Sequence, residues 1–170
     1  GTGSRGNATL VESGDAKILI DQGFSGKQLE TRLARMEIRP QEIDAIVLTH
    51  HHGDHGGGAS IAQRRWYIPI YCNDRTATAL NLDLRNVHLF ESLEALEFAD
   101  DFALLPVPVP HSGADNVAFI VSSCGERAAY VTDLGEATEE LKSHLKRCAH
   151  ISIEANYDHS RLISGPYPDS

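Results

Sequence analysis

The chain has 170 residues, enough to bury one sizeable core, and its apolar fraction of 41% and charged fraction of 23% are ordinary for a soluble globular protein. No apolar run approaches the roughly 20 residues of a membrane helix, so no membrane association is expected. The formal net charge of −9 argues against a surface that coats nucleic acid broadly, because such surfaces are usually basic. The three cysteines are widely spaced and odd in number, which favours a reducing, cytoplasmic location over a disulfide framework.

The apolar patterns along the chain predict short strands with intervening helices. Strands are expected, in chain order, at residues 8–12, 17–20, 43–48, 68–71, 87–90, 96–98, 102–109, 117–122, 128–132 and 150–154. Helices are expected after Ser25 and at residues 59–65, 74–80 and 136–147, with a helical turn at residues 40–43. Neither an internal repeat nor a low-complexity linker is visible, so residues 1–170 are expected to form a single domain of the α/β or α+β class.

Local features refine these expectations. Ser25 and Gln28 resemble a capping box at the start of the first helix. The buried face of that helix is expected to carry Leu29, Leu33 and Met36. Pro106 and Pro108 suggest that the strand at residues 102–109 lies at an edge or has a bulged end. Basic side chains cluster at three places, which most often are solvated helix faces: Arg32, Arg35 and Arg39; Arg64 and Arg65; and Lys142, Lys146 and Arg147.

Four imidazoles and one carboxylate follow the strand predicted at residues 43–48: His50, His51, His52, Asp54 and His55. In an extended segment, residues two apart point the same way, so His50 and His52 can converge on one metal ion. His51 then points away and is assigned a structural role. After the turn at Gly53, Asp54 and His55 can face a second ion, because imidazole and carboxylate are common ligands of divalent metals. A His-rich surface loop is the alternative interpretation.

Two further candidate ligands stand at the ends of later strands. His111 follows the strand predicted at residues 102–109, and Asp133 follows the one at residues 128–132. Each has an ordinary alternative, since His111 could be a simple loop histidine and Asp133 could cap the next helix. Together with the first motif, they predict one site that is built from separate strand ends of a rigid scaffold. The glycines at positions 56–58 are interpreted as places where the backbone passes close to the metals.

The stretch Thr49-His50-His51-His52-Gly53-Asp54-His55-Gly56 resembles the signature of the metallo-β-lactamase fold family of hydrolases. The resemblance implies an α+β fold of the αββα four-layer type. It also implies that Asp133, in the context Thr132-Asp133-Leu134-Gly135, bridges two ions. The expected metal ligands are therefore His50, His52, Asp54, His55, His111 and Asp133. The expected cofactors are two divalent ions per chain, zinc or manganese, with iron as a further candidate.

The segments at residues 3–7, 155–159 and 165–168 resemble the YycJ/WalJ-type branch of this family, which contains single-domain metal-dependent exonucleases. In that branch a strand precedes the first segment, and a Gly-His motif after the last segment supplies a final histidine ligand. The printed sequence contains neither. We therefore expect that the domain is truncated at both ends and that its second metal ion is bound more weakly. His159 is the alternative source of the final ligand.

The resemblance implies a phosphodiesterase, most simply a DNA exonuclease, in which a metal-bridging hydroxide is the nucleophile. Asp54 and Asp133 are the expected catalytic carboxylates. Substrate phosphate contacts are assigned to Ser4, Arg5 and Asn7. Glu154 is a candidate for fixing the imidazole tautomers from behind the ligands. Two alternatives stay open: hydrolysis of thioester, lactone or β-lactam carbonyls, and a catalytically impaired member that only binds metal. DNA or another phosphodiester is the expected partner, and no protein partner is expected.

Overall fold

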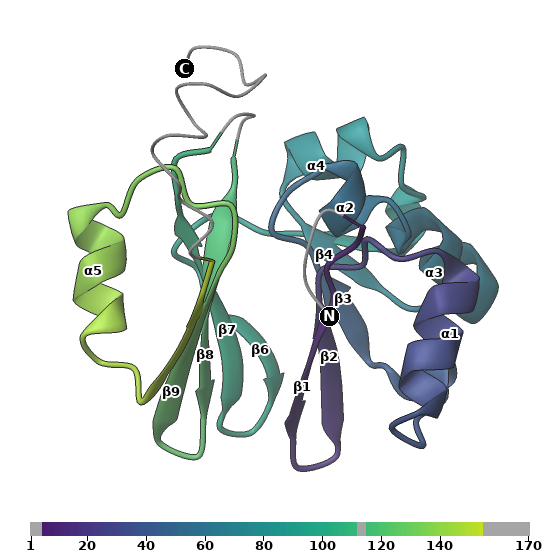
Figure 1. Cartoon of the computed structure of the whole chain (residues 1–170), viewed down its shortest axis with the longest axis horizontal. Coiled ribbons are helices and arrows are strands. Elements are labelled where there is room, and N and C mark those ends of the chain that lie inside the picture. Colours follow the sequence, from purple (N-terminus) through teal and green to yellow (C-terminus); the bar gives the residue numbers. More distant parts are fainter. Residues whose placement is uncertain (1–4, 112–114, 155–170) are drawn as a thin grey trace.

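Two five-stranded β-sheets form the centre of the molecule (Figure 1). The computed structural model describes residues 5–111 and 115–154. The first sheet has the order β1-β2-β3-β4-β5 and contains β1 (Thr9–Ser13), β2 (Ala16–Ile20), β3 (Ala45–Val47), β4 (Ile70–Cys72) and β5 (Val87–Leu89). The second has the order β10-β9-β8-β7-β6 and contains β6 (Leu96–Ala99), β7 (Phe102–Pro108), β8 (Val117–Ser123), β9 (Glu126–Val131) and β10 (His150–Ile153). The helices and helical turns are α1 (Gly26–Ala34), η1 (Pro40–Glu42), α2 (Gly53–Gly56), α3 (Ala59–Trp66), α4 (Asp74–Ala79), η2 (Leu84–Asn86) and α5 (Glu139–Leu145).

The sheets pack against each other and carry helices on their outer sides. Figure 1 shows α1 and α3 outside the first sheet and α5 outside the second. This arrangement confirms the predicted α+β class and the four-layer αββα sandwich. Within residues 5–111 and 115–154, no helix combines the length and the apolar character needed to cross a bilayer.

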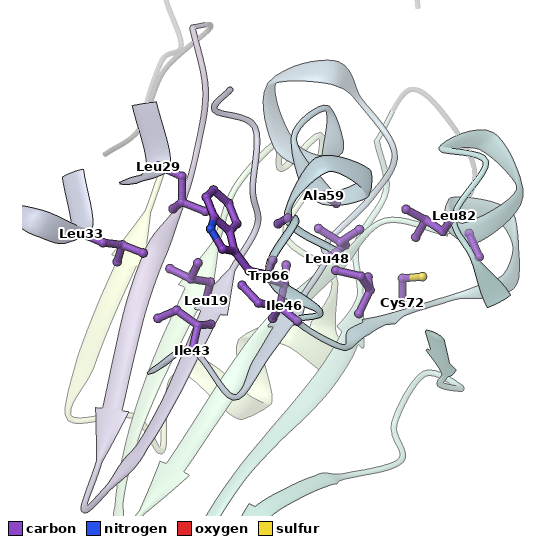
Figure 2. Packing of buried hydrophobic residues seen from close by; sticks show 14 of the residues in the cluster. Leu19, Leu29, Leu33, Ile43, Ile46, Leu48, Ala59, Trp66, Cys72 and Leu82 are labelled. Carbon is purple, nitrogen blue, oxygen red and sulfur yellow. The ribbon is translucent and has the colours of Figure 1, made fainter. Parts of the chain in front are cut away.

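The alternation of side chains along β2 explains why this sheet is buried on both faces. Successive strand residues point to opposite faces, and Ile18 and Ile20 enter the core between the sheets, where Phe119 of β8 belongs to the same cluster. Leu19 points the other way and joins the core beneath the helices, which includes Trp66 of α3 (Figure 2). Burial of each such side chain contributes roughly 1.5–3 kcal/mol, so this strand stabilises both cores.

Helix α1 begins as predicted and ends earlier than its apolar pattern suggests. The Ser25 side chain accepts a hydrogen bond from the Gln28 backbone, and the Gln28 side chain accepts one from Ser25, which completes the capping box. The chain reverses at Glu37, which has a φ of 61°. This reversal leaves Met36 53% exposed and returns Ile38 to the core. The assignment of Met36 to the buried face is therefore wrong.

Two expectations for the second half of the chain are also corrected. β7 lies between β6 and β8, so it is an interior strand. β6 pairs only with the part of β7 from Phe102 to Leu104, which explains how Pro106 and Pro108 are tolerated further along. Helix α5 begins at Glu139, three residues later than predicted, because the Thr138 side chain caps it by accepting from the Leu141 backbone N–H at 3.1 Å.

The strand directions bring several polar residues to one edge of the sandwich. β2 and β3 are parallel, so Asp21 and His50, which follow them, lie at the same edge. β1 is antiparallel to β2, and Asn7 therefore precedes β1 at this edge too. β7 and β9 both run antiparallel to β8, which places His111 and Asp133 beyond their carboxyl ends. The fold thus gathers residues that are more than 100 positions apart in the sequence.

Candidate metal centre

Three imidazoles from two strand ends converge at this edge. His50 Nε2 lies 2.9 Å from His52 Nδ1, and His52 Nδ1 lies 3.4 Å from His111 Nε2. His50 is buried, with 2% of its surface exposed, whereas His52 and His111 are half-buried. His51 is absent from this group, although its ring centre is only 5.1 Å from that of His52. The three converging nitrogens could hold one cation.

A second group of ligand atoms lies beside the first. His55, in the single-turn helix α2, places Nε2 2.6 Å from Asp133 Oδ2 and 3.6 Å from Asp54 Oδ2. The other oxygen of Asp133 faces the first group, with Oδ1 4.0 Å from His111 Nε2. His50 Nε2 is 3.8 Å from Asp133 Oδ2. The Asp133 carboxylate therefore lies between the two groups and reaches both.

The donor set fits divalent cations. At the usual zinc–nitrogen length, neighbouring ligand atoms in a tetrahedral site are about 3.3 Å apart, close to the imidazole separations in the first group. Asp133 Oδ2 is buried, and it lies 2.6 Å from His55 Nε2 and 3.8 Å from His50 Nε2. A buried carboxylate oxygen so close to imidazole nitrogens is well suited to a bound cation. The mixture of imidazole and carboxylate ligands suits zinc, manganese or iron.

Asp21, which the sequence analysis did not identify, supports both groups from behind. It is fully buried, and its Oδ1 accepts hydrogen bonds from the Thr49 backbone N–H at 2.8 Å and from the Thr49 hydroxyl at 2.9 Å. Asp21 Oδ2 lies 2.7 Å from His55 Nδ1. An ionised Asp21 thus keeps a hydrogen of His55 on Nδ1, so that Nε2 is the nitrogen that can release its proton and become a ligand. The signal in the sequence was a carboxylate directly after the strand beside β3.

Thr49 extends the same control to His50. Because its hydroxyl donates to Asp21, the Thr49 oxygen can accept from His50 Nδ1, which is 2.9 Å away. His50 Nε2 then carries the free lone pair that faces His52 and His111. One buried carboxylate therefore sets the tautomers of a histidine in each group.

The surroundings shift the protonation of these side chains in opposite directions. Burial lowers the pKa of His50 to about 3, with a further contribution from the neighbouring imidazoles of His55 and His52. Burial also works against the charged form of His55, but hydrogen bonds to Asp133 and Asp21 outweigh it and raise the pKa of His55 to about 10. The hydrogen bond with His55 lowers the pKa of Asp133, whereas burial raises that of Asp21.

Close backbone contacts fix the loop that carries Asp54. A Cβ at Gly23 would lie 1.8 Å from the Asp54 carbonyl oxygen, so only glycine fits there. At Gly58, a Cβ would lie 1.9 Å from the Phe24 carbonyl oxygen. The interpretation that the glycines at positions 56–58 make room for the metals is therefore corrected, because protein atoms occupy the space beside them.

The remaining predicted site residues lie in different places. Ser4 is outside the described residues, and Arg5 is exposed. Asn7 is buried, and its Nδ2 lies 2.9 Å from His55 Nε2 and 3.3 Å from Asp54 Oδ2. Glu154 accepts a hydrogen bond from the Asp133 backbone N–H at 2.9 Å. It thus holds the backbone of Asp133, which has a φ of 48°, and Asp21 and Thr49 also support the imidazoles from behind.

The sandwich and the cluster of histidines and aspartates at its edge are those of a metal-dependent hydrolase fold. The chain belongs to the metallo-beta-lactamase superfamily, whose profile matches residues 1–169.

Among its relatives, exodeoxyribonuclease YycJ of Bacillus anthracis is 27% identical over 171 residues, which cover 98% of this chain and 65% of that protein. Exodeoxyribonuclease WalJ of Streptococcus pneumoniae serotype 2 (strain D39) is 28% identical over 173 residues, which cover 98% of this chain and 64% of that protein. The chain thus spans just under two thirds of the length of these relatives. The crystal structure of MEM-A1, a subclass B3 metallo-beta-lactamase from a soil metagenome library, matches with a TM-score of 0.67 at 16% identity, over 88% of this chain and 73% of that chain. At this identity the likeness concerns the fold alone.

Proposed function

We propose that this chain carries the catalytic centre of a metal-dependent phosphodiesterase, most simply a DNA exonuclease. The observation that carries the proposal is the position of Asp133, whose two carboxylate oxygens face separate groups of ligand atoms, at 4.0 Å from His111 and 2.6 Å from His55. A carboxylate shared in this way suits a pair of cations that act together on one substrate group.

In this proposal each ligand has a defined place. His50, His52 and His111 would hold the first cation, and Asp54 and His55 would hold the second. Asp133 would be a ligand of both. In this assignment the second cation has two ligands besides the shared Asp133, one fewer than the first, so we expect it to be bound more weakly.

In this proposal, side chains of the protein orient the metal ligands and accept the proton of the attacking water. Two divalent cations, when bound, supply a water of lowered pKa and positive charge for the substrate oxygens. Asp54 is 35% exposed and Asp133 is 25% exposed, so Asp54 is the carboxylate more open to substrate. Asp54 Oδ2 is placed to take the proton of the attacking water, and Asn7 Nδ2, at 3.3 Å, restrains that oxygen. Asp21 and Thr49 keep the lone pairs of His55 and His50 aimed at the centre.

The names of the relatives favour DNA as the substrate. Both of the relatives described above are exodeoxyribonucleases, and the similarity to each covers 98% of the present chain. Arg5 is exposed two residues before Asn7, which contacts Asp54, so Arg5 can bind a phosphate near the centre. Ser4 completes the proposed phosphate contact but lies outside the described residues. The cysteines Cys72, Cys124 and Cys148 are free, which supports the proposed cytoplasmic location.

Substrate tests in one assay separate the open alternatives. With added Mn²⁺ or Zn²⁺, we expect turnover of bis-p-nitrophenyl phosphate and of labelled duplex DNA, and none of a thioester. Asp133→Asn should reduce diester turnover on the order of 10²–10³-fold, because the ligand shared by both cations is lost. Asp44→Asn makes the same change at an exposed carboxylate that accepts from the Lys17 backbone N–H, and should have no effect.

Turnover of the thioester alone would refute the phosphodiesterase proposal in favour of carbonyl chemistry. Absence of all turnover, together with less than one equivalent of bound metal, would favour a catalytically impaired member that only binds metal.

A further inference from the structure

The outer surface of α1 carries basic residues beside an apolar hollow. The hollow has a volume of about 420 Å³ and lies between α1 and the strands β1 and β2. Its apolar lining includes Leu10, Leu19, Leu29, Leu33 and Met36. Arg32 and Arg35 line this hollow and also a neighbouring one of about 250 Å³, which Lys27 borders as well. We call Lys27, Arg32 and Arg35 the α1 basic surface.

The charge of this surface is not neutralised locally. Among residues 5–111 and 115–154, no acidic residue lines either hollow, although the chain has 24 acidic and 15 basic residues. In the part of the chain that the structure describes, none of the three residues of the α1 basic surface has a carboxylate within ion-pair distance, whereas nearby Arg39 pairs with Glu42 and Arg65 pairs with Glu30. Three exposed cations in an acidic chain therefore remain available to an anionic partner.

The surface connects with the metal centre through Phe24. The guanidinium carbon of Arg32 lies 4.0 Å above the centre of the Phe24 ring, as in a cation–π contact. The carbonyl oxygen of Phe24 packs against Gly58, at the end of the loop that carries the ligands. A Cβ at Gly6 would lie 2.6 Å from the Phe24 ring, so the segment before Asn7 packs on the same side chain. Phe24 thus packs against Arg32 of the α1 basic surface and against two segments that adjoin the metal centre.

We propose that the α1 basic surface is the subsite for the DNA strand that enters the metal centre. Its three cations contact phosphates, and the apolar hollow takes a base or sugar. Arginine favours this occupant, because its planar guanidinium binds phosphate with two parallel hydrogen bonds. Lys27 and Arg35 are eight residues apart, which is about 12 Å along the helix axis. At the axial rise of about 3.4 Å per nucleotide of one strand, the surface spans roughly three to four nucleotides.

This inference rests on the proposed function, and a binding measurement tests it independently of turnover. A fluorescent single-stranded DNA with phosphorothioate linkages, which resist hydrolysis, is titrated with the metal-loaded protein at several salt concentrations. For Arg32→Gln/Arg35→Gln, we expect binding to weaken at least about fivefold and the slope of log K against log salt to shrink by about 1.4, from two lost phosphate contacts. Arg35→Gln alone, which leaves the contact on Phe24 intact, should shrink the slope by about 0.7.

The matched control is Lys146→Gln/Arg147→Gln, which removes the same charge from exposed positions at the end of α5, on the opposite outer layer (Figure 1). It should leave strand binding unchanged. Turnover of bis-p-nitrophenyl phosphate should be equal in the wild type and in both double variants, because the small diester does not reach the α1 basic surface.

The outcomes separate the two proposals. Equal weakening by both double variants would show that only net charge matters and would overturn the subsite. If the diester is turned over but Arg32→Gln/Arg35→Gln does not change strand binding, the subsite is overturned and the proposed function stays intact. This result would point to a protein segment as the occupant of the hollow. A wild-type protein that neither cleaves the diester nor binds the strand would overturn both.

Discussion

Replacement of Asp21 by asparagine tests whether the buried carboxylate controls the metal ligands. The side chain keeps its shape, but an amide nitrogen in place of Oδ2 would meet His55 Nδ1, 2.7 Å away, with a donor. His55 would then favour the tautomer with its hydrogen on Nε2, the atom that faces Asp133 at 2.6 Å. Loss of the charge-assisted hydrogen bond costs about 1.5–3 kcal/mol, which corresponds to roughly a 10- to 100-fold loss of metal affinity, as is typical for such supporting residues.

The assay is competition with a chromophoric chelator, with thermal unfolding of the metal-free protein measured in parallel. In the metal-free protein, Asp21 accepts a hydrogen bond from His55, whose pKa is raised to about 10, so Asp21→Asn removes one partner of a buried ion pair and should also lower the unfolding temperature of the metal-free protein. Asp44→Asn, at an exposed carboxylate that accepts from the Lys17 backbone N–H, is the control. An Asp21→Asn protein that unfolds at a lower temperature but binds metal with wild-type affinity would refute the reasoning.

Three further predictions follow from the same geometry. His52→Ala should abolish binding of the first cation, whereas His51→Ala should keep most of it, as measured by metal content after dialysis; equal loss would contradict the assigned geometry. Because the pKa of His55 is raised to about 10, it is protonated at neutral pH, so affinity at the second group should rise by up to about tenfold per pH unit from 7 towards 10. His50 should give the first group no such dependence, because its pKa of about 3 leaves it neutral. Calorimetry in buffers of different ionisation enthalpy would detect the proton that His55 releases. Gly23→Ala should destabilise the fold by at least about 1–3 kcal/mol in denaturant unfolding, since its Cβ would meet the Asp54 carbonyl, whereas Gly53→Ala has open space and should be near neutral.

Much of this arrangement could be predicted because it depends on local periodicity. The period of two predicts the shared direction of His50 and His52, and the structure brings these two side chains together. His111 and Asp133 could be suggested only because each follows a strand; their proximity depends on sheet order, which periodicity does not encode.

The features that sequence analysis missed all depend on contacts between distant segments. Asp21 resembles an ordinary strand-end aspartate until β2 and β3 are paired and Thr49 and His55 lie beside it. Gly58 was assigned to the metals because the Phe24 carbonyl that crowds it is more than 30 residues away in the sequence. Met36 fits the apolar spacing of α1, but the reversal at Glu37 turns it outward.

The central claim is that one carboxylate is shared by two cations at the edge of the sandwich. Anomalous scattering at the zinc and manganese absorption edges, from crystals grown with each metal, tests it directly. We predict two peaks, one among His50, His52 and His111 and a weaker one beside Asp54 and His55, both within ligand distance of Asp133. A single peak that Asp133 does not contact, or no peak at this edge, would contradict the account.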